Sequence, residues 1–296
     1  YRQGDVLVDY SAGHIESTES GELVQALSAE LGRDQIRFYS GVGYRHLLVY
    51  DNGPEDLVSY PPHDIMGESF AAHLPAGKGQ EKIRALMEAA EPILEAAPVN
   101  AARRTRGERP ANAIWLWGSG RALSLETFAE RYGLEGGVIS AVDLVRGIGK
   151  SAGLEVVDVP GITGYLDTNY EGKAEFALSV LQASDLVYVH VEAPDEAGHN
   201  GDIEAKIQAI EDFDRRVVGP ILAGLDRLGA CRVLITPDHR TPIALRTHSR
   251  EPVPFVLWGT EVEPDLMEAY NERAAEAGSM QVHHGYLLME YLIGKD

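Results

Sequence analysis

Apolar residues in the first hundred positions follow the two periods of regular secondary structure. Residues 21–31 and 79–97 have the apolar spacing of amphipathic helices. Runs rich in β-branched and aromatic residues, which are typical of strands, occupy residues 5–10, 35–40 and 44–50. The last of these runs ends at an Asp51–Gly53 turn. We therefore expect a small α/β arrangement in this part of the chain.

From residue 111 onward, strand-like and helix-like patterns alternate. Strands are expected at residues 113–117, 154–159, 186–191, 231–236 and 253–258. Helices are expected at residues 141–152, 172–183, 202–228 and 283–293. Such alternation predicts an α/β fold with a mostly parallel sheet and helices on both faces.

The change of pattern follows a polar, basic stretch at residues 100–110. Its arginines are Arg103, Arg104, Arg106 and Arg109. We interpret this stretch as a hinge or solvated surface loop between two domains, because clustered charges of one sign are usually solvated. The predicted domains are residues 1–110 and residues 111–296.

Charge and composition limit the classes of partner. The chain has 296 residues and a formal net charge of −20, which disfavours nucleic acid and an anionic membrane as partners because both attract basic surfaces. No apolar run approaches the roughly 20 residues that span a bilayer. The start lacks a secretory signal pattern, so we expect a cytoplasmic protein. A homo-oligomer is compatible with the sequence, which leaves the oligomeric state open.

Metal-capable side chains gather in three short segments of the second predicted domain. They are Asp195 and His199 after the strand at 186–191, Asp238 and His239 after the strand at 231–236, and His248 before the strand at 253–258. Cys231 is the single cysteine, so any metal is held by oxygen and imidazole nitrogen. Ligands in parallel sheets bind beyond the carboxyl ends of the strands, where two of these segments fall.

This donor set suits divalent cations such as Mn²⁺, Mg²⁺ or Zn²⁺. Two such ions about 4 Å apart can clamp a phosphoryl group during its transfer. A single aspartate or histidine at a strand end is more often a cap or a satisfied loop residue. Five metal-capable residues in three segments favour a metal site over five separate caps.

Three motifs carry a resemblance to a known family. PDEAGH at 194–199, TPDHRTP at 236–242 and THS at 247–249 followed by PVPF resemble the metal-binding signature of the alkaline phosphatase superfamily. DYSAGHI, ANAIWLWGSGR, ISAVDLVRGIGKSAGL and GITGYLDTNYEGKAEFAL are similar to segments of the archaeal-type cofactor-independent phosphoglycerate mutases. The similarity runs along the whole chain and implies an alkaline-phosphatase-like fold with a smaller inserted α/β domain.

The resemblance also implies roles for the metal-capable residues. Asp195, His199 and His248 would hold one ion, and Asp238 with His239 would help to hold a second. In the family a serine becomes phosphorylated, and it lies well before the DYSAGH segment, so we expect this nucleophile to lie outside the given chain, which begins at Tyr1. Ser119 in WGSG is better interpreted as part of a tight turn.

The first domain would then position the substrate. His14 lies in the Ser-Ala-Gly-His turn, whose backbone N–H groups could also receive an anion. Arg45 begins the strand at 44–50, and Arg121 follows the WGSG turn. These three cations are the candidates for binding the phosphate and carboxylate of the substrate, with surface salt bridges as the alternative interpretation.

The resemblance predicts an isomerase that interconverts 3- and 2-phosphoglycerate through a phosphoserine and two divalent ions, without 2,3-bisphosphoglycerate. A metal-dependent phosphatase, or a phosphotransferase acting on a small hydroxy acid as in relatives labelled proposed homoserine kinases, would use the same site. A truncated chain that binds metal without turnover is a third alternative.

Overall fold

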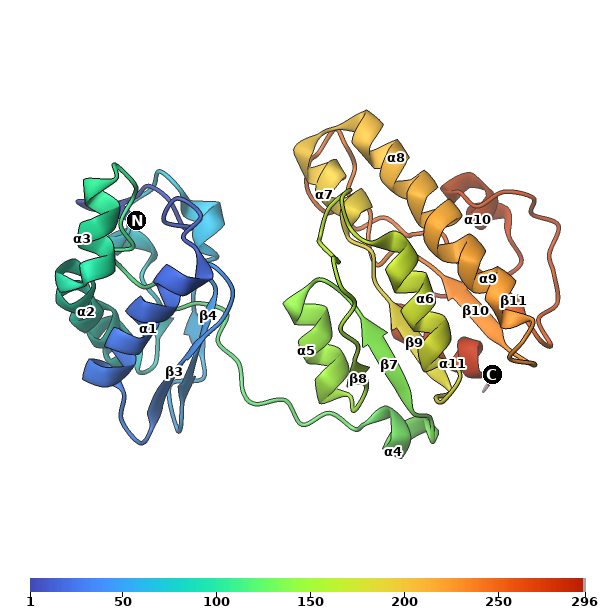
Figure 1. Cartoon of the computed structure of the whole chain (residues 1–296), viewed down its shortest axis with the longest axis horizontal. Helices are drawn as coiled ribbons and strands as arrows, with labels where there is room; N and C mark the ends of the chain where they lie inside the picture. Colours follow the sequence, from blue (N-terminus) through green and yellow to red (C-terminus); the bar gives the residue numbers. More distant parts are fainter. Residues whose placement is uncertain (295–296) are drawn as a thin grey trace. The chain divides into compact units, whose positions relative to one another are not determined.

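A computed structural model describes residues 1–294 of the chain. It divides into two compact units, Tyr1–Ala122 and Leu123–Asp296 (Figure 1). Within the described residues, no helix has the length and apolar character needed to cross a bilayer.

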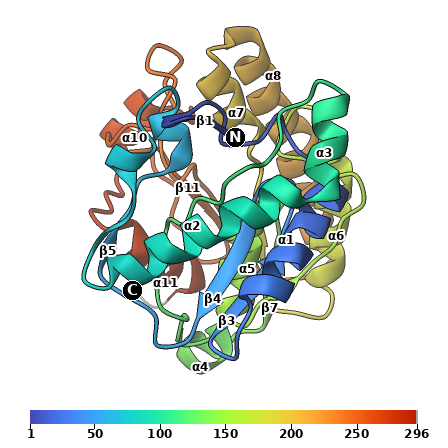
Figure 2. The same ribbon diagram turned by 90° about the vertical axis from the view of Figure 1, so that its left-hand side faces the viewer.

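The first unit packs three helices with a β-hairpin. The hairpin pairs β3 (Ile36–Ser40) with β4 (His46–Tyr50), and the helices are α1 (Ser17–Leu31), α2 (Gln80–Ala96) and α3 (Pro98–Thr105). The helices α1 and α2 lie side by side (Figures 1 and 2). Short pairs are formed by β1 (Arg2–Gln3) with β2 (Val6–Leu7) and by β5 (Leu57–Val58) with β6 (Ala76–Gly77). Single 3-10 turns occur at Pro62–Ile65 and Ala71–His73.

The helices of this unit follow the apolar spacing of the sequence. Leu23 and Leu27 of α1 pack with Ala90 and Leu94 of α2 in one buried cluster. This spacing of four residues places each pair on one face of its helix. The predicted helices and the predicted strands at 35–40 and 44–50 are therefore confirmed, although α1 begins four residues before the predicted start.

Two predictions for residues 100–117 are wrong. The basic stretch is a solvated loop only in its second half, because helix α3 covers residues 100–105 and Arg103 is only 4% exposed, whereas residues 106–109 are exposed and lie outside any helix. Residues 113–117 are extended but form no strand. Instead Trp115 packs edge-on against Phe70 and donates its indole N–H to the carbonyl of Tyr60. Residues 113–116 of the apolar run therefore pack, partly buried, against a hydrophobic cluster of the first unit. The compact units divide after residue 122 and not after residue 110.

The second unit contains a three-stranded parallel sheet. Its order is β8 (Glu155–Val156), β7 (Gly136–Ile139), β9 (Leu186–Val189). Helix α5 (Asp143–Ser151) packs against β7 and β8, and α6 (Tyr170–Val180) packs against β7 and β9. A short helix, α4 (Phe128–Tyr132), precedes the sheet and begins with a capping box of Thr127 and Glu130. The mixed α/β fold with a parallel sheet is confirmed, although β7 itself was not predicted.

The remaining strands pair separately. β10 (Arg232–Ile235) and β11 (Val256–Gly259) are antiparallel, so the parallel arrangement is less extensive than predicted. The helix predicted at 202–228 is α8 (Ile203–Phe213), a π-helical turn at Asp214–Val218 and α9 (Gly219–Leu225). The unit also contains α7 (Ala193–Asn200), α10 (Glu272–Ala277), a 3-10 turn at Gly285–Leu287 and α11 (Leu288–Ile293).

Candidate metal centre

Helix α7 presents two of the predicted ligands on one side. The chain leaves β9 after Val189 and enters α7 at Ala193, with Pro194 in the first turn, where its missing N–H costs no hydrogen bond. Asp195 and His199 are four residues apart, so their side chains share a face of the helix. His199 Nε2 lies 3.3 Å from Asp195 Oδ2.

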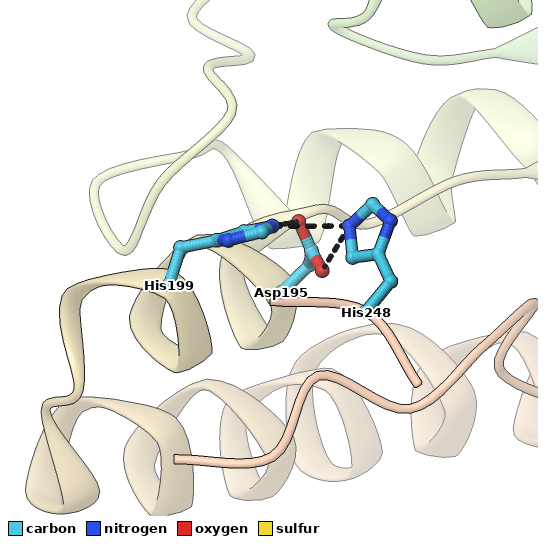
Figure 3. A group of neighbouring side chains, drawn as sticks. All are labelled: Asp195, His199 and His248. Carbon is cyan, nitrogen blue, oxygen red and sulfur yellow. Dashed lines mark hydrogen bonds and ion pairs between the residues drawn. The ribbon is translucent and has the colours of Figure 1, made fainter. Parts of the chain in front are cut away.

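His248 reaches the same place from the loop before β11. Figure 3 shows its ring and that of His199 directed toward the Asp195 carboxylate. His248 Nε2 lies 3.5 Å from Asp195 Oδ1 and 3.0 Å from His199 Nε2. One ligand atom from each of the three residues lies within 4.8 Å of the others, and Asp195 and His199 are half-buried.

The Nδ1 atom of His199 lies 3.0 Å from the carbonyl oxygen of Arg246. A carbonyl oxygen can only accept a hydrogen bond, so Nδ1 of the neutral imidazole carries the proton. The Nε2 lone pair then faces Asp195 and His248. Histidines that bind metals are held in this way, with the second ring nitrogen bonded to a carbonyl or carboxylate. The arrangement fits a cation between the three side chains.

The TPDH loop after β10 brings in the other two predicted ligands. The ring of His239 lies against that of His248, tilted by 31° with centroids 3.8 Å apart. Its Nδ1 lies 4.0 Å from Asp195 Oδ1, and its Nε2 lies 3.4 Å from Asp238 Oδ2. All five predicted ligands therefore meet in one cluster, with Asp238 at its exposed edge.

Two residues that support this cluster were missed from the sequence. Thr241 donates its hydroxyl hydrogen to Asp195 Oδ1, and its Oγ1 lies 3.3 Å from His239 Nδ1. Lys206 on α8 donates from Nζ to the carbonyl of Thr241 at 2.8 Å. Burial lowers the pKa of Lys206, and the nearby Asp195 and Glu272 oppose that shift. In the sequence, the one sign that Thr241 could support the site is its position two residues after His239. Nothing in the sequence indicates that Lys206 lies near the site.

A buried polar group lies at the carboxyl ends of β7 and β9. Ser140 Oγ is 3.1 Å from His190 Nδ1, and Lys173 donates from Nζ to the His190 carbonyl at 2.7 Å. Burial lowers the pKa of Lys173 to about 8, with Glu192 acting in the opposite direction. Burial, together with the charge of Lys173, also lowers the pKa of His190. These groups fix the strand end from which the chain enters α7.

The predicted substrate-binding cations lie in the first unit. His14 is exposed, Arg45 is exposed and covers the ring of Tyr44 at 4.5 Å, and Arg121 forms a salt bridge with Glu55. The strand β4 begins at His46, so Arg45 precedes it.

Three N–H groups of the Ser-Ala-Gly-His turn are already bonded within the chain, contrary to our expectation that they could receive an outside anion. Those of Ser11 and Gly13 donate to Asp9 at 2.8 Å each, and that of His14 donates to Ser11 Oγ at 3.1 Å. The carboxylate of Asp9, two residues before Ser11, takes two of these hydrogen bonds.

Comparison with known proteins identifies the relatives of the chain. Residues 49–294 match the sequence model of the metalloenzyme superfamily. A protein of Geobacter sulfurreducens named as a probable 2,3-bisphosphoglycerate-independent phosphoglycerate mutase is 51% identical over 98% of this chain and 73% of its own length. A mutase of the same name from Methanosarcina acetivorans is 51% identical over 92% of this chain and 69% of its own length.

A solved structure from Pyrococcus horikoshii has a TM-score of 0.77 and 25% identity, covering 98% of this chain and 73% of that one. A second structure, a cofactor-independent phosphoglycerate mutase from Thermoplasma acidophilum, has a TM-score of 0.63 and 24% identity over 99% of this chain and 74% of its own. The second match supports the fold alone.

Proposed function

Because the chain belongs to the 2,3-bisphosphoglycerate-independent phosphoglycerate mutase family within the metalloenzyme superfamily, we propose that it interconverts 3- and 2-phosphoglycerate. The reaction moves a phosphoryl group between two hydroxyls of glycerate, so it is an isomerisation by phosphoryl transfer. The observation that carries the proposal is the convergence of Asp195, His199 and His248 with ligand atoms within 4.8 Å of one another.

We assign two divalent ions to this cluster. Asp195, His199 and His248 would hold the first, and Asp238 with His239 would contribute to the second. Carboxylate oxygens and neutral imidazoles suit Mn²⁺, Mg²⁺ or Zn²⁺. When bound, such ions supply positive charge to the phosphoryl oxygens and to the attacking and leaving oxygens.

The surrounding residues keep these donors in place before an ion arrives. The Arg246 carbonyl sets the His199 tautomer, and Thr241 fixes the Asp195 carboxylate through its hydroxyl. Lys206 in turn holds the Thr241 main chain. Rigid support of this kind lowers the cost of assembling the site.

We further propose that the first unit, residues 1–122, is an inserted, substrate-positioning domain. His14, Arg45 and Arg121 would neutralise the phosphate and carboxylate of phosphoglycerate. Such local cations are needed because the chain as a whole carries a formal net charge of −20. No serine of residues 1–296 is assigned as the nucleophile, so the residue that carries the phosphoryl group stays open.

The natural protein should form 2-phosphoglycerate from 3-phosphoglycerate without added 2,3-bisphosphoglycerate. Activity should require Mn²⁺ or a similar ion and disappear in excess chelator. Product analysis by ³¹P NMR distinguishes the alternatives, since it resolves both phosphoglycerates and inorganic phosphate. Full mutase activity in chelator would overturn the metal assignment. Release of phosphate with no 2-phosphoglycerate would identify a phosphatase instead.

A further inference from the structure

The turn that carries His14 has an unusual backbone. Ala12, Gly13 and His14 have φ values of +50°, +71° and +53° in succession. The left-handed region is open to glycine but costs about 1 kcal/mol or more for each residue with a Cβ atom. Ala12 is also buried, at 4% exposure. A turn of this kind persists only where its surroundings hold it, and such strain is most often found at functional positions.

The Asp9 carboxylate occupies the concave side of this turn. Its Oδ1 accepts from the Ser11 backbone N–H at 2.8 Å and from the Ser11 hydroxyl at 2.7 Å, and its Oδ2 accepts from the Gly13 N–H at 2.8 Å. Successive N–H groups in positive-φ turns form a concavity that binds anions. Here the anion belongs to the chain itself.

Two arginines from about 100 residues further along the chain complete the turn's support. Arg109 donates to Asp9 Oδ2 at 2.6 Å. Arg103 donates from Nη2 to the Ala12 carbonyl at 2.7 Å and from Nε to the Arg109 carbonyl at 2.9 Å, and it also pairs with Glu19 on α1. The basic stretch therefore fastens the His14 turn to α3.

The charge state of Asp9 is consistent with this arrangement. Burial acts to raise the pKa of Asp9, but hydrogen bonds from the Ser11 side chain, Arg109 and the backbone of Ser11 and Gly13 outweigh it. The pKa is therefore held well below its usual range, and the carboxylate stays charged throughout neutral and mildly acidic conditions.

We propose that Asp9, Arg103 and Arg109 are positioning residues that hold the Ala12–His14 turn in its left-handed form, so that the exposed His14 imidazole is pre-oriented for the anionic substrate. This inference rests on the proposed function, because it takes His14 as part of the phosphoglycerate site. None of the three positioning residues needs to touch the substrate. Misplacement of a substrate-binding group by about 1 Å can lower a rate about 100-fold, so the turn need not unfold for activity to fall.

Arg109→Met in the natural protein removes the charge that anchors Asp9 while keeping most of the side-chain length. Arg109→Lys keeps the charge, and Arg104→Met is the matched control, because Arg104 lies in the same stretch but, within residues 1–294, donates its side-chain hydrogen bonds to Glu95 alone. We expect Arg109→Met to lower kcat/KM for 3-phosphoglycerate about 10- to 100-fold. Arg109→Lys should restore much of this loss, and Arg104→Met should match the natural protein.

A second measurement does not depend on mutase activity. The imidazole resonances of His14, assigned by comparison with His14→Gln, are followed by NMR while inorganic phosphate is added. We expect a saturable shift in the natural protein and in Arg104→Met, and a weakened one in Arg109→Met.

An unaltered His14 spectrum and phosphate response in Arg109→Met would overturn the positioning role. So would equal losses of kcat/KM in Arg109→Met and Arg104→Met. Absence of mutase activity from the natural protein, with the His14 response still dependent on Arg109, would instead refute the proposed reaction and leave the turn's role in anion binding intact.

Discussion

Thr241 donates its hydroxyl hydrogen to Oδ1 of Asp195, the same oxygen that lies 3.5 Å from Nε2 of His248. The hydroxyl therefore orients a carboxylate that faces two imidazoles, His199 and His248. Thr241 is only 5% exposed, and Lys206 donates a hydrogen bond to its carbonyl oxygen. Burial and this hydrogen bond hold the residue, and with it the hydroxyl, in place. Outer partners of this kind commonly change metal affinity when they are removed.

Thr241→Val should weaken Mn²⁺ binding by about 10- to 100-fold, since valine keeps the shape of threonine but cannot donate to Asp195. Isothermal titration calorimetry of the metal-free protein measures this. Thr241→Ser keeps the hydroxyl and should bind Mn²⁺ nearly as the natural protein does. Equal affinities of the valine variant and the natural protein would show that Asp195 needs no such support.

His199→Ala should abolish high-affinity Mn²⁺ binding at the Asp195 cluster. The change removes one of three converging donors, and the remaining two cannot enclose the ion. His199 is half-buried on the short helix α7, so the far-UV circular dichroism should stay close to that of the natural protein. His284→Ala is the control, because His284 is exposed and its ring stacks on Tyr286, away from the cluster's five residues. Retained Mn²⁺ affinity in His199→Ala would exclude His199 as a ligand.

The cluster could be foreseen because its members occupy particular places in the chain. Asp195 and Asp238 each follow a strand closely, and the spacing of Asp195 and His199 is a local property of a helix. The alternation of strands and helices predicted that these segments meet at one edge of a parallel sheet. They do meet, although β10 pairs antiparallel with β11 and not with the strands of that sheet. The exact register of the strands does not enter this argument.

Other features depend on contacts between distant residues and were missed for that reason. The interior position of Arg103 depends on the Ala12 carbonyl, 91 positions away, so a charge count alone indicated a solvated loop. Trp115 belongs to an apolar run that resembles a strand, yet it packs on Phe70 without strand partners. The strand β7 has only four residues, two of them glycine, which hides its β-propensity.

The two glycines of α5 make a matched test of how this helix packs on the sheet. A Cβ atom added at Gly149 would come within 2.5 Å of Val138 Cγ1 on β7, whereas one added at Gly147 meets no atom within 4 Å. Gly149→Ala should therefore lower the free energy of unfolding by about 1–3 kcal/mol through overpacking. Gly147→Ala should raise it by about 0.5–1 kcal/mol, because alanine is the better helix former.

Urea denaturation of both glycine variants measures the two changes. The expected result is a lower free energy of unfolding for Gly149→Ala and a higher one for Gly147→Ala. Because both substitutions add one methyl group to the same helix, the opposite changes would come from the difference in packing. A stabilising Gly149→Ala would mean that α5 does not lie as close to β7 as the structure places it.

Lys173 is 1% exposed and donates to the carbonyl of His190, the residue after β9. Burial lowers its pKa from 10.5 to about 8 in the folded protein. Between these two values the unfolded chain binds a proton that the folded chain has released, so the free energy of unfolding rises with pH. Below about pH 8 both states are protonated, and the folded state bears the full cost of burying the charge.

Lys173→Met removes this titration. The free energy of unfolding of the natural protein minus that of Lys173→Met should therefore increase by about 2 kcal/mol between pH 7.5 and pH 9.5, since one unit of pKa corresponds to about 1.4 kcal/mol. Urea denaturation at both pH values measures it. Titrating groups that both proteins share, such as Lys206, contribute equally to both free energies of unfolding and cancel in the difference. A difference that is constant over this pH range would mean that Lys173 keeps an ordinary pKa, and hence that its ammonium reaches solvent.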